Sequence, residues 1–166
     1  MPVHAGPVLV DANTIIEAHK KGCWAALVGR YQLETVEECF AETQTGAQGR
    51  QPEERIDGPA LRGQLTTVHK VTVRELASLE LLDGPFLDAG EKALWAHALP
   101  RKDDWVLCGP DRASMSFGFK NGKRARLVSL GGLLTQIGHR PRIALAGHYE
   151  QAWLDDVLSK LTLGVL

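Results

Sequence analysis

Short apolar runs that end near an acid constrain this chain more than any other feature of its sequence. Val8, Leu9 and Val10 form one such run, which has β-branched residues at both ends and is followed at once by Asp11. This composition is typical of a strand that is buried on both faces of a parallel sheet. An acid at the carboxyl end of a central strand lies where open α/β sheets form their ligand crevices. Asp is also a frequent helix N-cap, so Asp11 has a purely structural interpretation as well.

A second apolar run, 105–108, is followed three residues later by Asp111. Patterns typical of helices separate the apolar segments, in the order β-αα-β-α-β-αα-β-α-β-αα. Strands separated by helices predict a parallel sheet with helices on both faces. The sequence therefore predicts an α/β fold with a mainly parallel sheet of five strands.

The boundaries of the predicted elements follow from periodicity and from capping residues. The expected strands lie at 8–10, 31–35, 68–73, 105–108 and 126–130. The expected helices lie at 14–20, 23–28, 37–43, 74–82, 88–99, 112–117, 131–137 and about 148–161. Thr35 is a candidate N-cap for the third helix, and Asp88 with Glu91 has the spacing of a capping box. Asp83-Gly84-Pro85 should end the helix before it.

Length and composition predict an ordinary globular protein. The chain has 166 residues, of which 44% are hydrophobic and 23% charged, and its formal net charge is −1. We expect one soluble domain over 1–166, with an exposed loop at about 44–64 and an amphipathic C-terminal helix that serves as a packing or dimer face. No apolar run reaches the roughly 18 residues of a membrane span, and the first residues do not resemble a secretion signal.

The cysteines and histidines add little to the interpretation. Three dispersed cysteines without a C-x-x-C pair favour reduced thiols and a cytoplasmic location. The six histidines show no metal-ligand spacing, so we expect most of them to be structural or at the surface.

Four acids form the candidate site. Asp11 and Asp111 should converge on one edge of the sheet if their strands are neighbours, and Glu42 and Glu91 lie on helices that could point at the same edge. Carboxylates brought together repel one another strongly, so such a cluster needs either a cation or protonation. Oxygen ligands without cysteine or histidine favour Mg²⁺ or Mn²⁺. One or two such ions can activate water and stabilise a phosphodiester transition state.

A structural alternative exists for the helix acids. Asp88 and Glu91 could do no more than cap a helix, while Glu38 and Glu42 could be solvated. This alternative does not explain why two buried strands are both followed by an acid.

Four motifs in this order and spacing resemble the PIN-domain nucleases. They are Val-Leu-Val-Asp11-Ala-Asn-Thr, Thr35-Val-Glu-Glu-Cys-Phe-Ala-Glu42, Leu87-Asp-Ala-Gly-Glu91-Lys-Ala-Leu-Trp-Ala and Trp105-Val-Leu-Cys-Gly-Pro-Asp111. The later Leu127-Val-Ser-Leu130 and the helix after it are similar to the end of that fold. The resemblance covers about 8–134 and implies a Rossmann-like α/β/α sandwich.

The resemblance also implies a function. PIN-domain proteins hold Mg²⁺ or Mn²⁺ with clustered acids and cut RNA. Many small bacterial members are toxins of toxin–antitoxin pairs and form homodimers, so an antitoxin and a second copy of the chain are expected partners of a toxin-type member. Asp11, Glu42, Glu91 and Asp111 match the four catalytic, metal-binding acids of the family. Supporting polar groups would be Asn13 and Ser114.

The sequence departs from the family pattern in three ways. Gly109 stands where many members have Thr or Ser, so a hydroxyl near the site is missing. The loop at 44–64 is longer than in minimal members. Glu38 is an alternative to Glu42, and Asp88 is an alternative to Glu91.

A basic stretch follows the fourth acid along the chain. It comprises Lys120, Lys123, Arg124 and Arg126, with Arg140 and Arg142 later in the sequence. A local basic patch beside an acidic metal centre would suit an RNA backbone. A charged connection of this kind is nevertheless more often a solvated loop.

Three functions remain open from the sequence. The first is a metal-dependent endoribonuclease, a hydrolase that cuts RNA phosphodiester bonds. The second is a non-catalytic binding or regulatory module of the same fold. The third is a phosphatase of the haloacid-dehalogenase kind, which ranks lowest because Asn13 stands where that chemistry needs a second acid.

Overall fold

A five-stranded parallel sheet forms the centre of the molecule. The computed structural model describes residues 2–45, 50–51, 55–82 and 86–166. The strands lie in the order β3-β2-β1-β4-β5, and every neighbouring pair is parallel. They are β1 (Pro7–Val10), β2 (Gln32–Val36), β3 (Thr67–His69), β4 (Val106–Cys108) and β5 (Leu127–Val128).

Nine α-helices surround the sheet within the described residues. Six lie before β4: α1 (Ala12–Lys20), α2 (Trp24–Arg30), α3 (Glu37–Thr45), α4 (Gly58–Gln64), α5 (Val73–Glu80) and α6 (Ala89–Ala98). Three follow it: α7 (Arg112–Lys120), α8 (Leu130–Gln136) and α9 (Gln151–Thr162). Two short 3₁₀ turns complete the chain, η3 (Arg124–Arg126) and η4 (Gly147–Tyr149).

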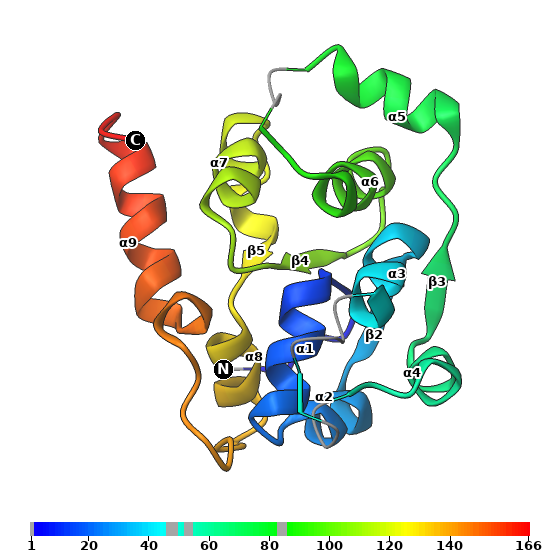
Figure 1. Ribbon diagram of the computed structural model, residues 1–166. Helices are drawn as coiled ribbons and strands as arrows, with labels where there is room; N and C mark the ends of the chain where they lie inside the picture. Colours follow the sequence, from blue (N-terminus) through cyan, green and yellow to red (C-terminus); the bar gives the residue numbers. More distant parts are fainter. Residues whose placement is uncertain (1, 46–49, 52–54, 83–85) are drawn as a thin grey trace.

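The helices form a layer on each face of the sheet (Figure 1). Along β1, Leu9 belongs to the core under α5, α6, α7 and α9, whereas Val8 and Val10 belong to the core under α1, α2, α4 and α8. This alternation is the two-residue period of a strand that is buried on both faces. The predicted Rossmann-like α/β/α sandwich with a five-stranded parallel sheet is confirmed.

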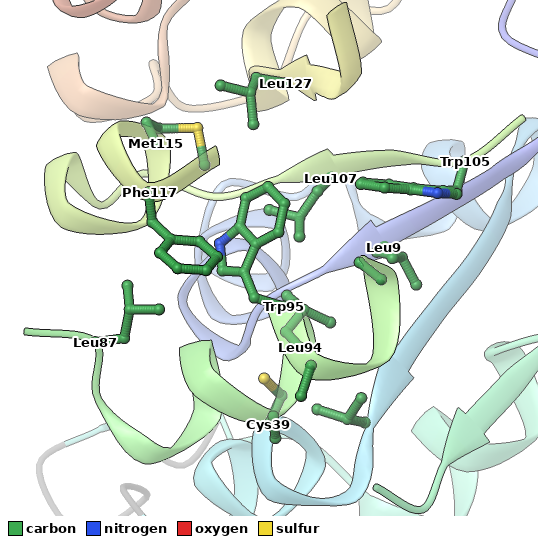
Figure 2. Packing of buried hydrophobic residues seen from close by; sticks show 14 of the residues in the cluster. Leu9, Cys39, Leu87, Leu94, Trp95, Trp105, Leu107, Met115, Phe117 and Leu127 are labelled. Carbon is green, nitrogen blue, oxygen red and sulfur yellow. The ribbon is translucent and has the colours of Figure 1, made fainter. Parts of the chain in front are cut away.

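Trp95 of α6 is the centre of the first core (Figure 2). Its ring meets Trp105 edge-on at 6.1 Å and Phe117 at 5.4 Å between centroids. Edge-to-face pairs of this kind add about 1 kcal/mol each to the free energy gained by burying the rings. Trp95 Nε1 donates a hydrogen bond to Ser114 Oγ at 2.8 Å, so the polar atom of this buried indole has a hydrogen-bond partner. These contacts fix α6 against α7, and both helices begin at acids of the candidate site.

The prediction of an exposed loop at about 44–64 is wrong for the second half of that range. Residues 58–64 form α4, whose Leu61 is fully buried in the second core, and Ile56 before it is 8% exposed. The stretch was rich in Gly, Gln and Arg, and its few apolar residues gave no periodic signal. The sheet nevertheless offers these apolar side chains a surface to pack on. Positions 46–49 and 52–54 of the predicted loop, like the predicted stop at 83–85, lie outside the described residues.

Three smaller predictions also need correction. The strand expected at 68–73 ends at His69, because Thr72 caps α5 in a capping box with Glu75. Thr35 is not a helix cap. It lies in β2, and its Oγ1 donates to the Val10 carbonyl at 2.6 Å. The strand expected at 126–130 is only two residues long, with η3 before it and α8 after it.

The C-terminal helix α9 packs on the first core. Its buried residues include Leu154, Val157 and Leu158, which join the cluster that also holds residues of α6 and α7. The amphipathic pattern therefore serves packing within this chain. None of the described helices has the length and apolar character that crossing a membrane would need.

Candidate acidic metal site

The candidate site lies at the carboxyl edge of the sheet, after two neighbouring strands. β1 pairs directly with β4, with Val10 opposite Cys108. The Asp11 amide continues this pairing by donating to the Cys108 carbonyl at 3.4 Å. The expected convergence of the two strand ends is therefore confirmed, and Asp11 and Asp111 follow them on one edge.

Asp11 caps α1 and is also buried. Its Oδ1 accepts a hydrogen bond from the Thr14 amide at 2.8 Å, so the structural interpretation of this residue is correct. Only 6% of the residue is exposed. The pKa of Asp11 is raised to about 7, mainly by burial and also by the nearby carboxylates of Asp88 and Glu42, although hydrogen bonds from Thr14 lower it in part. A cap needs no buried charge, so capping alone does not explain this environment.

Glu42 of α3 points at the first turn of α6. A Cβ atom added to Gly90 would lie 2.5 Å from Glu42 Oε1, so the carboxylate lies directly against this glycine. Burial and the charge of Asp88 raise the pKa of Glu42, while a hydrogen bond from the Gly90 backbone lowers it. Only glycine leaves room for this close approach.

Asp88 and Glu91 form the predicted capping box of α6. Asp88 Oδ1 accepts from the Glu91 amide at 2.8 Å, and Glu91 Oε2 accepts from the Asp88 amide at 3.2 Å. Asp88 is exposed, whereas Glu91 is buried. Burial raises the pKa of Glu91 to about 8, with further contributions from Asp111, Asp88 and Asp11.

Asp111 caps α7, as Asp11 caps α1. Its Oδ1 accepts from the Ser114 amide at 3.1 Å, and the Ser114 hydroxyl accepts from Trp95. Ser114 therefore links Asp111 to the core beneath the site. The charge of Asp111 raises the pKa of Glu91, so the two carboxylates belong to one electrostatic cluster.

These acids, Asp11, Glu42, Asp88, Glu91 and Asp111, are called the carboxylate cluster below. They do not form a closed cage, because no three of them have ligand atoms that all lie within 4.8 Å of one another among the described residues. Gly109 borders the cluster, since a Cβ atom added there would lie 3.3 Å from Asp11 Oδ2. The hydroxyl that the family pattern places at this position would therefore face Asp11.

Two further predicted site residues, Asn13 and Glu38, have other surroundings. Asn13 is exposed on α1, and its carbonyl accepts from the Tyr149 hydroxyl at 3.3 Å. Glu38 lies one turn before Glu42 on α3, and its Oε2 is buried without a hydrogen-bond partner among the described residues.

The basic stretch does not lie beside the acids. Arg126 donates to the carbonyls of Asp103 and Trp105 at 3.0 and 2.9 Å, and these two residues precede β4 at the amino edge of the sheet. Arg124 donates to Thr162 Oγ1 at 2.6 Å. Lys120 is the last residue of α7, which crosses from the acidic edge to this opposite edge, and Lys123 follows the helix. Proximity in sequence therefore does not become proximity in space.

Arg142 belongs to the same amino edge. It lies 3.4 Å from the position that a Cβ atom at Gly22 would occupy, beyond the end of α1. The RNA-binding role of these basic residues stays a prediction, and it would require a substrate that spans the molecule between the two edges.

A second group of potential metal ligands was missed in the sequence. Glu34, His69 and His97 each offer one ligand atom, and these atoms all lie within 4.8 Å of one another. Residues at positions 34, 69 and 97 show no motif spacing. The register of β2 against β3 and the last turn of α6 bring them together.

No family model matches the chain, and no curated protein matches it significantly.

Proposed function

We propose that the protein is a Mg²⁺- or Mn²⁺-dependent endoribonuclease of the PIN type. The observation that supports this proposal is the carboxylate cluster at the carboxyl edge of β1 and β4, where the pKa of Asp11 is raised to about 7 and that of Glu91 to about 8. Burial is the largest cause of both shifts, and the neighbouring carboxylates add to it. A bound cation would stabilise the charged form of such buried acids.

The donor set fits a hard divalent cation. Asp11, Glu42, Glu91 and Asp111 offer only carboxylate oxygens, which suit Mg²⁺ and Mn²⁺. Mg²⁺ commonly keeps several waters and is held by one or two carboxylates together with substrate phosphates. The open spacing of the cluster is consistent with an ion shared in this way. When bound, such an ion activates water and stabilises the negative charge of a phosphodiester transition state.

The chain itself orients the carboxylates. The amides of Thr14 and Ser114 each bind one oxygen of Asp11 and Asp111. The Asp88 amide does the same for Glu91. These caps use Oδ1 of each aspartate and Oε2 of the glutamate, so the second oxygen of each carboxylate is left for a ligand. Helix N-termini also favour negative charge, which assists the approach of a phosphate to the same edge.

Cleavage of labelled RNA in the presence of Mn²⁺ tests the proposal. We expect Asp111→Asn to lower the cleavage rate by about 100-fold or more while the fold survives, because Asn keeps the N-cap and loses the charge. Asp57→Asn is the matched control, since Asp57 precedes α4, is exposed and accepts no cap hydrogen bond. Equal cleavage by the wild type and Asp111→Asn would reject the proposal.

A non-catalytic binding module is the second candidate. It is favoured by the open spacing of the cluster and by Gly109, which supplies no hydroxyl beside Asp11. RNA binding without cleavage, unchanged in Asp111→Asn, would support it. The toxin-type role, the antitoxin, the homodimer and the cytoplasmic location stay predictions from the sequence and the resemblance.

A further inference from the structure

The cluster of Glu34, His69 and His97 lies between the sheet and α6, on the side of the edge strand β3. Glu34 is 6% exposed, although it is a carboxylate in the middle of a strand. The rings of His69 and His97 stack at 3.8 Å between centroids, and both histidines are half-buried. A carboxylate and two imidazoles from three separate elements therefore share one small, partly enclosed space.

A cationic group already occupies the centre of this space. Arg101 Nη1 lies 2.9 Å from Glu34 Oε1 and 2.9 Å from His97 Nε2. Because a guanidinium can only donate, His97 Nε2 must accept, and its lone pair points into the centre. Burial, together with the charges of His69 and Arg101, lowers the pKa of His97 to about 4. The ring is thus neutral at neutral pH, as a metal ligand must be.

Arg101 has a second partner, which can hold the guanidinium when Nη1 leaves the centre of the Glu34, His69 and His97 cluster. Its Nε and Nη2 contact both carboxylate oxygens of the exposed Asp103, at 3.0 and 2.6 Å. The bidentate pair therefore does not depend on Nη1. Displacement of Nη1 would leave Glu34 and His97 facing the centre together with His69, whose Nε2 is 2.5 Å from Glu34 Oε1.

We infer that Glu34, His69 and His97 form a site for a divalent transition metal of the zinc class, which binds in exchange for the Arg101 guanidinium. One carboxylate and two imidazoles suit Zn²⁺, Co²⁺ or Ni²⁺ and are poor ligands for Mg²⁺. Three protein ligands leave a fourth position for water. On binding, the Nε2 proton of His69 passes to solvent, and the ring binds the ion as a neutral imidazole with its proton on Nδ1. Glu34 exchanges the guanidinium for the ion, and Arg101 keeps Asp103. The bound ion joins β2, β3 and α6.

Calorimetric titration with Zn²⁺, and visible absorption with Co²⁺, test this site. The variants are His97→Gln and Arg101→Gln, and the matched control is His148→Gln, which removes an exposed histidine on η4. We expect one Zn²⁺ per wild-type chain and an absorption band typical of tetrahedral Co²⁺. His97→Gln should weaken binding by at least about tenfold, because it removes one of three ligands. Arg101→Gln should strengthen it, because the competing cation is gone. His148→Gln should leave binding unchanged.

Several outcomes would overturn the inference. Binding that survives in His97→Gln would place the ion elsewhere, and repeating the titration with Asp111→Asn would show whether the carboxylate cluster holds it. Binding only in Arg101→Gln would show that the guanidinium holds its position permanently in the natural chain. Absence of binding in a folded Arg101→Gln, with folding verified by circular dichroism, would show that the three ligands do not form a site.

Discussion

Asp11 combines a structural and a chemical role in one side chain. One carboxylate oxygen caps α1, and the other faces Gly109 at the edge of the carboxylate cluster. The cap explains why Asp or Asn suits this position, but only the negative charge can attract a cation. The two roles can therefore be separated by substitution.

Asp11→Asn and Asp11→Ala should differ in stability but not in metal binding. Asn keeps the hydrogen bond from the Thr14 amide, whereas Ala loses it and should lower the free energy of unfolding by about 1 kcal/mol. Both variants should lose Mn²⁺ binding because both lose the charge. Urea denaturation with a chelator measures the first effect, and calorimetric titration with Mn²⁺ measures the second. Wild-type Mn²⁺ affinity in Asp11→Asn would show that Asp11 is a cap and nothing more.

At the scale of elements, the contact between α6 and α7 positions half of the site. Glu91 lies in the first turn of α6, and Asp111 caps α7. The two helices meet where a Cβ atom at Gly118 would lie 2.6 Å from the Trp95 ring. Glycine is needed here for the close approach of one helix to a large aromatic side chain.

Gly118→Ala should therefore destabilise the protein despite the better helix propensity of alanine. The added methyl group meets a fully buried ring, and overpacking of this kind costs about 1 to 3 kcal/mol. Gly29→Ala is the matched control, since nothing beyond its chain neighbours and the backbone of its own helix lies within 4 Å of the position of its Cβ. That variant should be neutral or more stable by about 0.5 kcal/mol. Equal midpoints of thermal unfolding for the two variants would contradict this account of the contact.

At the scale of the whole molecule, the carboxylate cluster makes stability depend on pH. Folding raises the pKa of Asp11 from 3.8 to about 7 and that of Glu91 from 4.5 to about 8. The folded state then holds protons that the unfolded chain has released, so this contribution to stability falls as pH rises through these values. The lowered pKa of His97 has the opposite effect on stability, because the unfolded chain then binds a proton that the folded state does not. This effect operates only below the unfolded pKa of 6.5.

Stability without metal should consequently fall between pH 6.5 and pH 8. We expect the free energy of unfolding to decrease by about 1 to 2 kcal/mol across this range in the presence of a chelator. Mn²⁺ at pH 8 should restore it, because the ion replaces the lost protons. Thermal unfolding at both pH values checks the result, with Glu91→Gln as the variant whose pH dependence should be weaker. Stability that is flat over this range would contradict a cluster of repelling acids.

The sequence by itself determined the sheet and the acids that follow its central strands. Strands that are buried in a parallel sheet are typically wholly apolar. Residues 8–10 and residues 105–108 both show this pattern. The capping box of Asp88 and Glu91 could also be predicted from the sequence, because it depends on residues three positions apart. Local signals of this kind need no knowledge of the rest of the chain.

Only the tertiary structure decided which distant residues meet. It placed the basic residues around Arg126 at the opposite edge from the acids, because α7 crosses the whole sheet between them. It also built the cluster of Glu34, His69 and His97, whose members come from two strands and a helix. Strand order, register and helix direction determine which of these residues come into contact. All three depend on packing between elements, which no short stretch of sequence encodes.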